Sequence, residues 1–285
     1  ETRLVAKGGN ARISTGIPRL DAMVGGAGYA AGSAVMFTGR SGSAKTLFAA
    51  TLARAAADQG RRVLYVSFEE SPGDLRHNVR SVGIELGDGV AVHAQRAVEM
   101  GLEDHLIHII DLAEAEAPDV LVLDPISTLI DMGSQRQVKM LLIRFLSHLK
   151  SRGITNVLTE LIPDSAGEHS GLDLSSLVDS WFRLRHVETN GELNRLIHVV
   201  KARGAATSDQ VKEFRISGEG IAIEDPYIGE GRMVFGAEKA TRMEQEKEEA
   251  GLRRRKLEQT RRALEALESA HRARQQTLDM EFEGR

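Results

Sequence analysis

The sequence has 285 residues, of which 41% are hydrophobic and 27% charged, as expected for one large α/β domain with an appendage. It contains no cysteine, which excludes disulfide bonds and thiolate metal sites. The net charge of −4 makes nucleic acid an unlikely partner, and no apolar run approaches the roughly 20 residues of a membrane helix. We therefore expect a cytoplasmic protein that is not bound to a membrane.

The first strong pattern follows a lead-in over residues 1–33. Residues 35–39 are apolar and predict a buried strand, after which a glycine-containing turn leads to Lys-Thr at the start of a helix. This is the layout of a P-loop, in which backbone N–H groups and a lysine hold the phosphates of ATP. The expected ATP-binding residues are Gly39, Ser41, Gly42, Ser43, Ala44, Lys45, Thr46 and Leu47.

Ala44 stands where the P-loop pattern has its last glycine. We expect an alanine to be tolerated there, because the start of a helix would give it a helical φ.

Strand-like and helix-like segments alternate after the P-loop. The expected strands are 62–68, 90–94, 120–124 and 155–160, and the expected helices are 47–58, 72–82, 101–116 and 137–151. This alternation predicts a mostly parallel sheet with right-handed crossovers. Residues 165–176 are polar and predict an exposed loop or a loose helix. Two hairpins follow, around Asn190-Gly191 and around residues 218–220, so the predicted class is an α/β P-loop domain whose sheet is extended by antiparallel hairpins.

Three carboxylates follow predicted strands. Asp124 ends an all-apolar strand, and with a P-loop upstream we expect it to hold Mg²⁺ beside the hydroxyl of Thr46. Glu69 and Glu70 close the strand 62–68 at its carboxyl end, where α/β proteins bind ligands. A carboxylate there can activate an oxygen nucleophile for attack on the γ-phosphate. The alternative is a solvated helix N-terminus, where the dipole favours acids; we favour the catalytic interpretation.

Lys201 and Arg203 lie at the end of the second strand of the first hairpin. Alternation places both side chains on one face, where they could contact a phosphate, including one bound to another subunit. The alternative is an edge strand whose charges prevent aggregation.

The composition changes at about residue 237, where a tail rich in Glu, Arg, Lys, Gln and Ala begins. A seven-residue spacing relates Met243, Ala250, Leu257, Leu264, His271 and Leu278. The row three residues further on is largely polar, so only half of a coiled-coil seam is present. A solvated single helix, a disordered tail and a coiled coil between subunits all remain open. We expect an ATPase domain over residues 1–236 and a charged helical tail over residues 237–285.

Together, the P-loop, Glu69-Glu70, Asp124, the Asn-Gly-Glu hairpin and the Lys-Ala-Arg-Gly segment resemble KaiC, a family of circadian-clock ATPases of the RecA superfamily. The resemblance covers about residues 13–223 and is to the second, autophosphorylating domain of a two-domain protein. It implies a RecA-like fold and a homohexameric ring with Mg-ATP between subunits. Lys201 and Arg203 would then reach the nucleotide of a neighbouring subunit.

The resemblance also implies particular roles. Glu69 would be the general base for phosphoryl transfer, with Glu70 beside it, and the phosphoacceptor pair would fall on Ser175 and Ser176. A third acceptor would map to Ser170, although the preceding loop is shorter here. A KaiB-like clock protein is a candidate partner. The short C-terminal peptide of the family is replaced by the charged tail.

We therefore predict an ATPase and serine/threonine autokinase that transfers the γ-phosphate of Mg-ATP to its own serines and also hydrolyses ATP, in circadian or timer-type regulation. The tail is expected to join subunits or rings. One alternative is a RecA-type motor on DNA, which should have basic pore loops; residues 161–180 contain no basic cluster. Another is a nucleotide-held scaffold that recruits partners through its tail.

Overall fold

The computed structural model describes residues 11–96, 100–162, 174, 176–189, 191–204, 211–229, 232–234 and 236–283. The chain divides into two compact units, Glu1–Pro226 and Tyr227–Arg285. None of the described helices is both long enough and apolar enough to cross a membrane.

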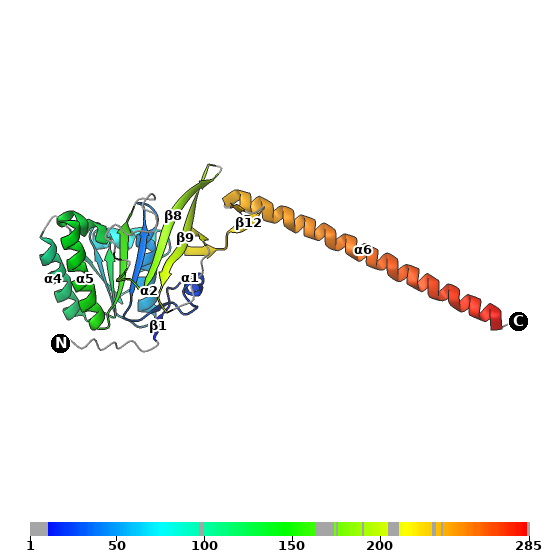
Figure 1. Cartoon of the computed structure of the whole chain (residues 1–285), viewed down its shortest axis with the longest axis horizontal. Helices are drawn as coiled ribbons and strands as arrows, with labels where there is room; N and C mark the ends of the chain where they lie inside the picture. The colour runs from blue at the N-terminus through cyan, green and yellow to red at the C-terminus, as the bar shows by residue number, and fades with distance from the viewer. Residues whose placement is uncertain are drawn as a thin grey trace. The chain divides into compact units, whose positions relative to one another are not determined.

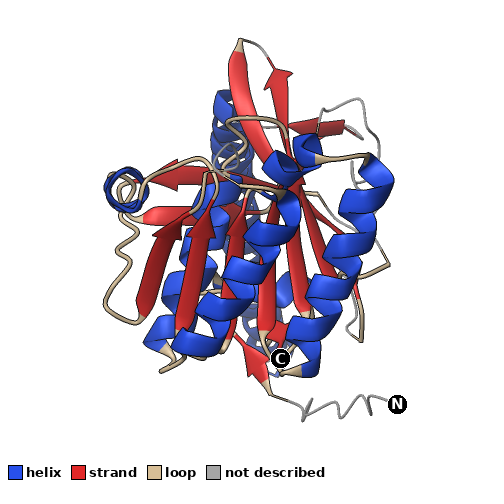
Figure 2. Ribbon diagram, turned by 90° about the vertical axis from the view of Figure 1, so that its left-hand side faces the viewer, coloured by secondary structure: helices blue, strands red, loops and turns tan. Residues whose placement is uncertain are grey.

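The first unit is built on a nine-stranded sheet in the order β11-β10-β9-β8-β3-β7-β6-β4-β5 (Figure 2). The neighbours from β8 to β5 run parallel, whereas β9, β10 and β11 are antiparallel. The strands are β3 Ala34–Gly39, β4 Val63–Ser67, β5 Val90–Ala94, β6 Val120–Asp124, β7 Thr155–Leu161, β8 Ser180–Thr189, β9 Glu192–Ala202, β10 Lys212–Ser217 and β11 Gly220–Glu224. The predicted mostly parallel sheet with antiparallel hairpins is confirmed.

Helices cover both faces of this sheet. The helices are α1 Pro18–Met23, α2 Lys45–Asp58, α3 Pro72–Arg80, α4 Leu102–Glu116 and α5 Gln135–Ser151, with a 3-10 helix η2 over Ile126–Met132 and a two-strand pair of β1 Arg12–Ile13 and β2 Tyr29–Ala30. The core on one face contains residues of α2 and α3, and the core on the other contains residues of α4 and α5, which lie side by side in Figure 1. This layering is the expected consequence of parallel strands joined by helical crossovers.

Local signals position the helix starts. Ser71 caps α3 by accepting from the N–H of Asp74, and Pro72 occupies the first turn, where its missing N–H costs nothing. Ser134 and Gln137 form a capping box at the start of α5. The sequence therefore specifies where the chain enters these two helices, and α5 begins two residues before the predicted position.

A chain of aromatic contacts fixes α2 against the sheet. Phe37 of β3 stacks on Phe48 of α2 at 5.3 Å and on Phe182 of β8 at 5.0 Å between ring centroids. Phe214 of β10 meets Phe48 edge-on at 5.1 Å. Each such buried ring contributes on the order of 2–3 kcal/mol, so the helix that follows the P-loop is tied to three strands.

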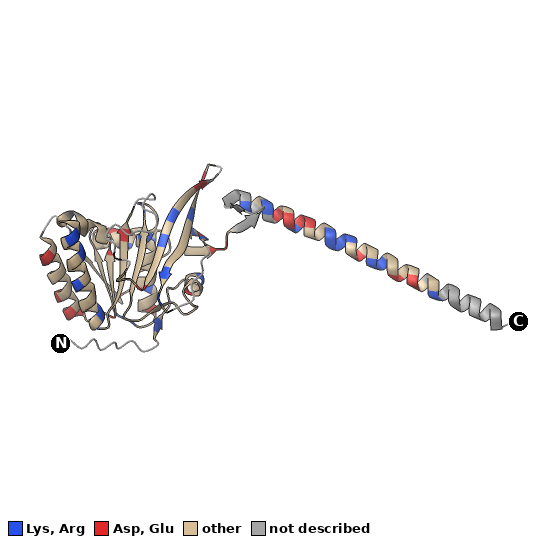
Figure 3. Ribbon diagram, in the orientation of Figure 1, with Lys and Arg blue, Asp and Glu red and all other residues tan. Residues whose placement is uncertain are grey.

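The second unit contains a short hairpin and one long helix. β12 Tyr227–Gly229 pairs with β13 Arg232–Val234, a hairpin that the sequence does not predict, and α6 spans Gly236–Glu283. Pairs of Arg and Glu four residues apart support the helix, and its charges are spread along its length in Figure 3. Four leucines of the helix are exposed by 57–74%: Leu252, Leu257, Leu264 and Leu267. The predicted domain boundary at residue 236 and the coiled coil stay predictions.

Candidate functional site

The turn between β3 and α2 requires backbone freedom at two glycines. A Cβ on Gly39 would lie 2.6 Å from the carbonyl oxygen of Leu184 and 2.6 Å from Ser43 Oγ, so no side chain fits there. Gly42 has a φ of +75°, in the left-handed region. The chain therefore turns tightly at the carboxyl end of β3 and delivers Lys45 at the first position of α2.

Ala44 does not have the helical φ that we expected, and that prediction is wrong. Its φ is +73° and its ψ is 20°, which is the left-handed conformation. The turn geometry imposes this conformation, because the residue directly before α2 must reverse the chain. An alanine pays a steric cost there of roughly 1–2 kcal/mol from its Cβ, which the usual glycine avoids.

Lys45 is buried at the base of this turn and its Nζ donates to the carbonyl of Arg40 at 2.9 Å. Burial lowers the pKa of Lys45, and the negative charges of Asp124 and Glu69 oppose that shift. Ser43 Oγ is also buried and has no hydrogen-bond partner among the described residues. A lysine ammonium, an unpartnered hydroxyl and the free N–H groups of a helix start suit the oxygens of a phosphate chain.

The other predicted P-loop residues lie on either side of Lys45 in the turn and the first turn of α2. Ser41 and Gly42 are exposed at the tip, Thr46 is half-buried in the first turn of α2, and Leu47 packs partly against the core. Arg40 donates from Nε to Nδ1 of His186 at 2.9 Å, which ties the turn to β8.

Asp124 is buried, with 4% of its surface exposed, at the end of β6. Its Oδ2 accepts from the phenol of Tyr65 at 2.6 Å, and its Oδ1 accepts from the hydroxyl of Thr159. These donors come from β4 and β7, the two neighbours of β6 in the sheet. Neither residue is indicated by the sequence pattern, because their contact with Asp124 depends on the order of the strands.

The donors expected for a metal are both oxygen ligands, the Thr46 hydroxyl and the Asp124 carboxylate. Among the described residues, no group of three or more His, Cys, Asp or Glu side chains forms a metal site. Mg²⁺ is usually held by one or two protein oxygens together with the phosphates of a substrate. The donor set therefore fits a magnesium ion that is brought by a nucleotide.

The two consecutive glutamates differ in their surroundings. Glu70 accepts from Nδ2 of Asn78 at 2.9 Å, and its N–H donates to Ser67 Oγ at 3.0 Å. Glu69 is exposed, and within the described part of the chain its carboxylate accepts no hydrogen bond, although its charge acts on Lys45. The carboxylate of Glu70 is therefore held by α3, whereas that of Glu69 is exposed just after β4.

The predicted cations lie at the opposite edge of the sheet. β8 runs parallel to β3 with Ser180 level with Val35, and Ala202 at the end of β9 lies opposite Ser180. Lys201 and Arg203 therefore lie near the amino end of β3, whereas the P-loop follows its carboxyl end. A strand of this length spans about 17 Å at roughly 3.3 Å per residue.

Arg203 is held beside one of the predicted acceptors. Its Nη2 donates to the carbonyl of Ser176 at 2.8 Å, and its Nη1 lies 3.5 Å from Oδ1 of Asp179. Lys150 at the end of α5 pairs with the other oxygen of Asp179 at 2.7 Å. The sequence pattern does not indicate Lys150 or Asp179, since their contact joins α5 to the start of β8. Ser175 and Ser170 lie outside the described residues.

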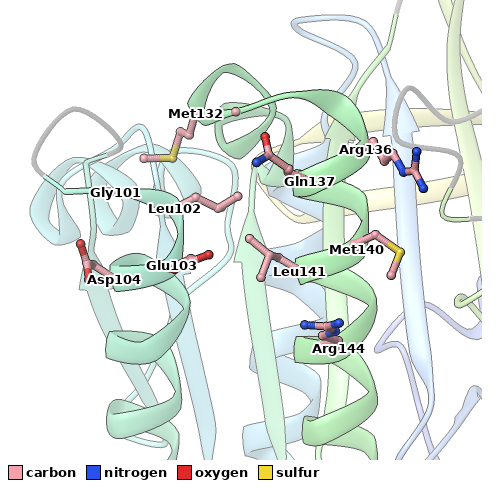
Figure 4. Close-up of a pocket in the computed structure, with 11 residues that line it drawn as sticks. Gly101, Leu102, Glu103, Asp104, Met132, Arg136, Gln137, Met140, Leu141 and Arg144 are labelled. Carbon is pink, nitrogen blue, oxygen red and sulfur yellow. The ribbon is translucent and has the colours of Figure 1, made fainter.

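A cavity of about 620 Å³ lies between α4 and α5, away from the P-loop (Figure 4). It is lined by residues of α4, η2 and α5 such as Glu103, Met132, Arg136 and Met140. None of the predicted ATP-binding, metal-binding or catalytic residues lines it. We therefore assign the candidate site from the chemistry at the carboxyl ends of β3, β4 and β6 and not from this cavity.

The P-loop follows the central strand β3, the acidic end of β6 lies two strands away, and antiparallel strands extend the sheet on the other side. This arrangement defines a P-loop protein of the RecA-like class. Residues 13–227 match the model of the ATPase family KaiC, and the chain belongs to this family. It is 37% identical over 279 residues to the circadian clock protein KaiC2 of Synechocystis sp., covering 95% of this chain and 49% of the relative.

Two further relatives are named circadian clock oscillator protein KaiC. Those of Picosynechococcus sp. and Synechococcus elongatus are each 30% identical over 242 residues, covering 82% of this chain and 47% and 46% of the relatives. The chain thus spans about half the length of the curated relatives it matches.

We predict that Ala44→Gly stabilises the protein, because glycine relieves the left-handed alanine. The free energy of unfolding should rise by about 0.5–1 kcal/mol, the steric gain being partly offset by the greater freedom of glycine in the unfolded chain. Urea denaturation of the full chain measures this change.

Ala117 provides the matched control, since it is exposed, has a φ of +44° and ends α4. Ala117→Gly should stabilise the protein similarly but leave nucleotide binding unaltered. A loss of stability on Ala44→Gly would contradict the strained conformation.

Proposed function

We propose that this chain is an ATPase and autokinase subunit that acts with copies of itself. One subunit holds Mg-ATP with Lys45, Thr46 and Asp124, and a neighbour supplies Lys201, Arg203 and the acceptors Ser175 and Ser176. The observation that carries this proposal is the hydrogen bond from Arg203 to the Ser176 carbonyl, at the sheet edge opposite the P-loop.

The separation of these groups favours transfer between subunits. A γ-phosphate on Lys45 and a hydroxyl near Arg203 of the same chain would be about a strand length apart, far beyond the roughly 3–3.5 Å that reacting atoms need. A second subunit whose β9 end meets this P-loop would bring the cations and the acceptor together. A homohexameric ring, as the KaiC family suggests, supplies such a contact at every interface.

The proposed reaction uses Glu69 and Lys45 of one subunit and Arg203 of its neighbour. A serine Oγ or a water oxygen forms the new bond to the γ-phosphorus, and the bond from that phosphorus to the ADP oxygen breaks. Glu69 accepts the proton of the attacking O–H, while Lys45 and the neighbour's Arg203 offset the charge on the phosphoryl oxygens. Thr46 and Asp124 would hold Mg²⁺ when it is bound, and the ion would offset the negative charge of the phosphates.

The clock role is proposed from the relatives, since their printed names call them circadian clock proteins. A KaiB-like protein is accordingly a candidate partner. The transfer to serine separates this function from that of a motor on DNA or a nucleotide-held scaffold, both of which would leave the serines unmodified.

Lys45→Ala should abolish ATP binding, because no other ammonium replaces the charge in the buried turn. Assembly should be lost with it if ATP lies between subunits. Fluorescent-nucleotide binding and light-scattering mass at saturating ATP measure the two effects. Ser41→Ala is the control, since Ser41 is exposed and a P-loop binds mainly through backbone N–H groups. A Lys45→Ala variant that still forms the wild-type assembly with ATP would refute the proposed interface.

Glu69→Gln should lower phosphate incorporation by roughly 10²–10⁴-fold while ATP still binds, because the amide cannot accept the proton. Glu70→Gln is the adjacent control and should change incorporation by less than about tenfold, as Glu70 is engaged by Asn78. Mass spectrometry of the phosphoserines measures both. Equal losses in the two variants would contradict the assignment of Glu69 as the base.

Assemblies mixed from two variants test whether phosphate is transferred within one chain or between subunits. Glu69→Gln subunits keep their acceptors, and subunits with Ser175→Ala and Ser176→Ala keep their base. Neither variant should be phosphorylated alone, whereas mixed assemblies should contain phosphate on the Glu69→Gln chains. Absence of phosphate in assemblies shown to be mixed would indicate transfer within one chain.

For the tail, we propose that α6 pairs with α6 of another subunit through its exposed leucines. Replacing Leu257 and Leu264 by Asn in the full chain should reduce the mass of the assembly to that of one ring, because the apolar contact is lost. One pair of helices contributes little binding free energy, but several tails on one ring bind at the same time, so the rings associate by avidity. Light scattering measures the mass, with a chain ending at Gly236 for comparison. An unchanged mass in both variants would disprove the pairing.

A further inference from the structure

We propose that Tyr65 is a positioning residue for the metal-binding carboxylate. Its phenol O–H holds Asp124 in the orientation that receives the Mg²⁺ of Mg-ATP. The inference rests on the proposed function for its ligand, and it adds a residue from the core of β4 that belongs to none of the motifs described above.

The first support is the geometry of the carboxylate. Tyr65 Oη donates to Oδ2 at 2.6 Å, and Thr159 Oγ1 donates to Oδ1. The two oxygens are therefore held from different strands, which prevents rotation of the carboxylate about its last torsion. Each oxygen keeps a second lone pair that a magnesium-bound water can use.

The second support is the position of the three residues in the sheet. β4, β6 and β7 are neighbours, and alternate residues of each strand pack with α2 in one core. Tyr65 belongs to that core, and Asp124 and Thr159 lie an even number of residues from its members Val122 and Val157. All three side chains thus lie on the α2 face, on which Thr46 and Lys45 begin the helix.

The third support is that both partners of this hydrogen bond are buried. Tyr65 is fully buried, and Asp124 has 4% of its surface exposed. A buried carboxylate without donors is strongly disfavoured. The hydroxyl therefore both stabilises the negative charge of Asp124 and orients its carboxylate.

The test compares Tyr65→Phe with Tyr29→Phe in the full chain. Tyr29 is also a fully buried tyrosine, but its hydroxyl has no hydrogen-bond partner in the described structure. Binding of a fluorescent ADP analogue is titrated with Mg²⁺, and Mn²⁺ bound together with ADP is counted by electron paramagnetic resonance. Tyr65→Phe should raise the Mg²⁺ concentration for half-maximal binding by about 10-fold or more, the usual effect of losing a residue that orients a metal ligand. Tyr29→Phe should leave it unchanged.

Binding measured in EDTA should be equal in the wild type and both variants, which separates a metal effect from a damaged nucleotide site. Unchanged or tighter metal dependence in Tyr65→Phe would overturn the inference, since the phenol would then be a core filler or a competitor of the metal. If Tyr65→Phe does not fold, Thr159→Val tests the same carboxylate at its other oxygen, with the same expectation and the same overturning results. If nucleotide binding to the wild type does not depend on the Mg²⁺ concentration, the proposed function is refuted instead.

Discussion

The carboxylate of Asp124 is the constraint on which the candidate site depends. A buried charge is tolerated only when donors surround it, and here the donors come from both neighbouring strands, through Tyr65 and Thr159. This requirement fixes β4, β6 and β7 relative to one another at their carboxyl ends. Because the same edge carries Glu69 and faces the start of α2, holding one carboxylate also places the candidate base and the phosphate-binding lysine.

The turn before α2 contains a residue with a strained backbone conformation. Ala44 is left-handed although alanine disfavours that conformation. The helix after it is fixed by a chain of aromatic contacts that reaches three strands, and Gly39 permits the close approach of Leu184 before it. Since packing fixes both ends of the turn, the backbone of residues 40–44 between them is constrained, and Ala44 keeps its left-handed conformation.

The elements that can be predicted from the sequence are those determined by a short stretch of residues. The apolar strands, the P-loop and the Asn190-Gly191 turn each have a signal within a few residues, and the parallel sheet follows from their alternation. The contacts of Tyr65 with Asp124 and of Lys150 with Asp179 have no such signal, because they join residues 59 and 29 positions apart through the strand order. The pattern predicts a helical φ for Ala44 because a helix begins there, but the residue directly before the helix completes the turn and is left-handed.

Three cations and one carboxylate lie close together at the amino end of β8. Lys150 and Arg203 surround the single carboxylate of Asp179, and Lys201 lies close enough to be affected by all three. The pKa of Lys201 is lowered, first by burial and then by the charge of Arg203. Asp179 thus brings Lys150 and Arg203 together at the start of β8. The proposed transfer between subunits would place the phosphate of a neighbour's nucleotide at this cluster, which lies about a strand length from the P-loop of its own chain.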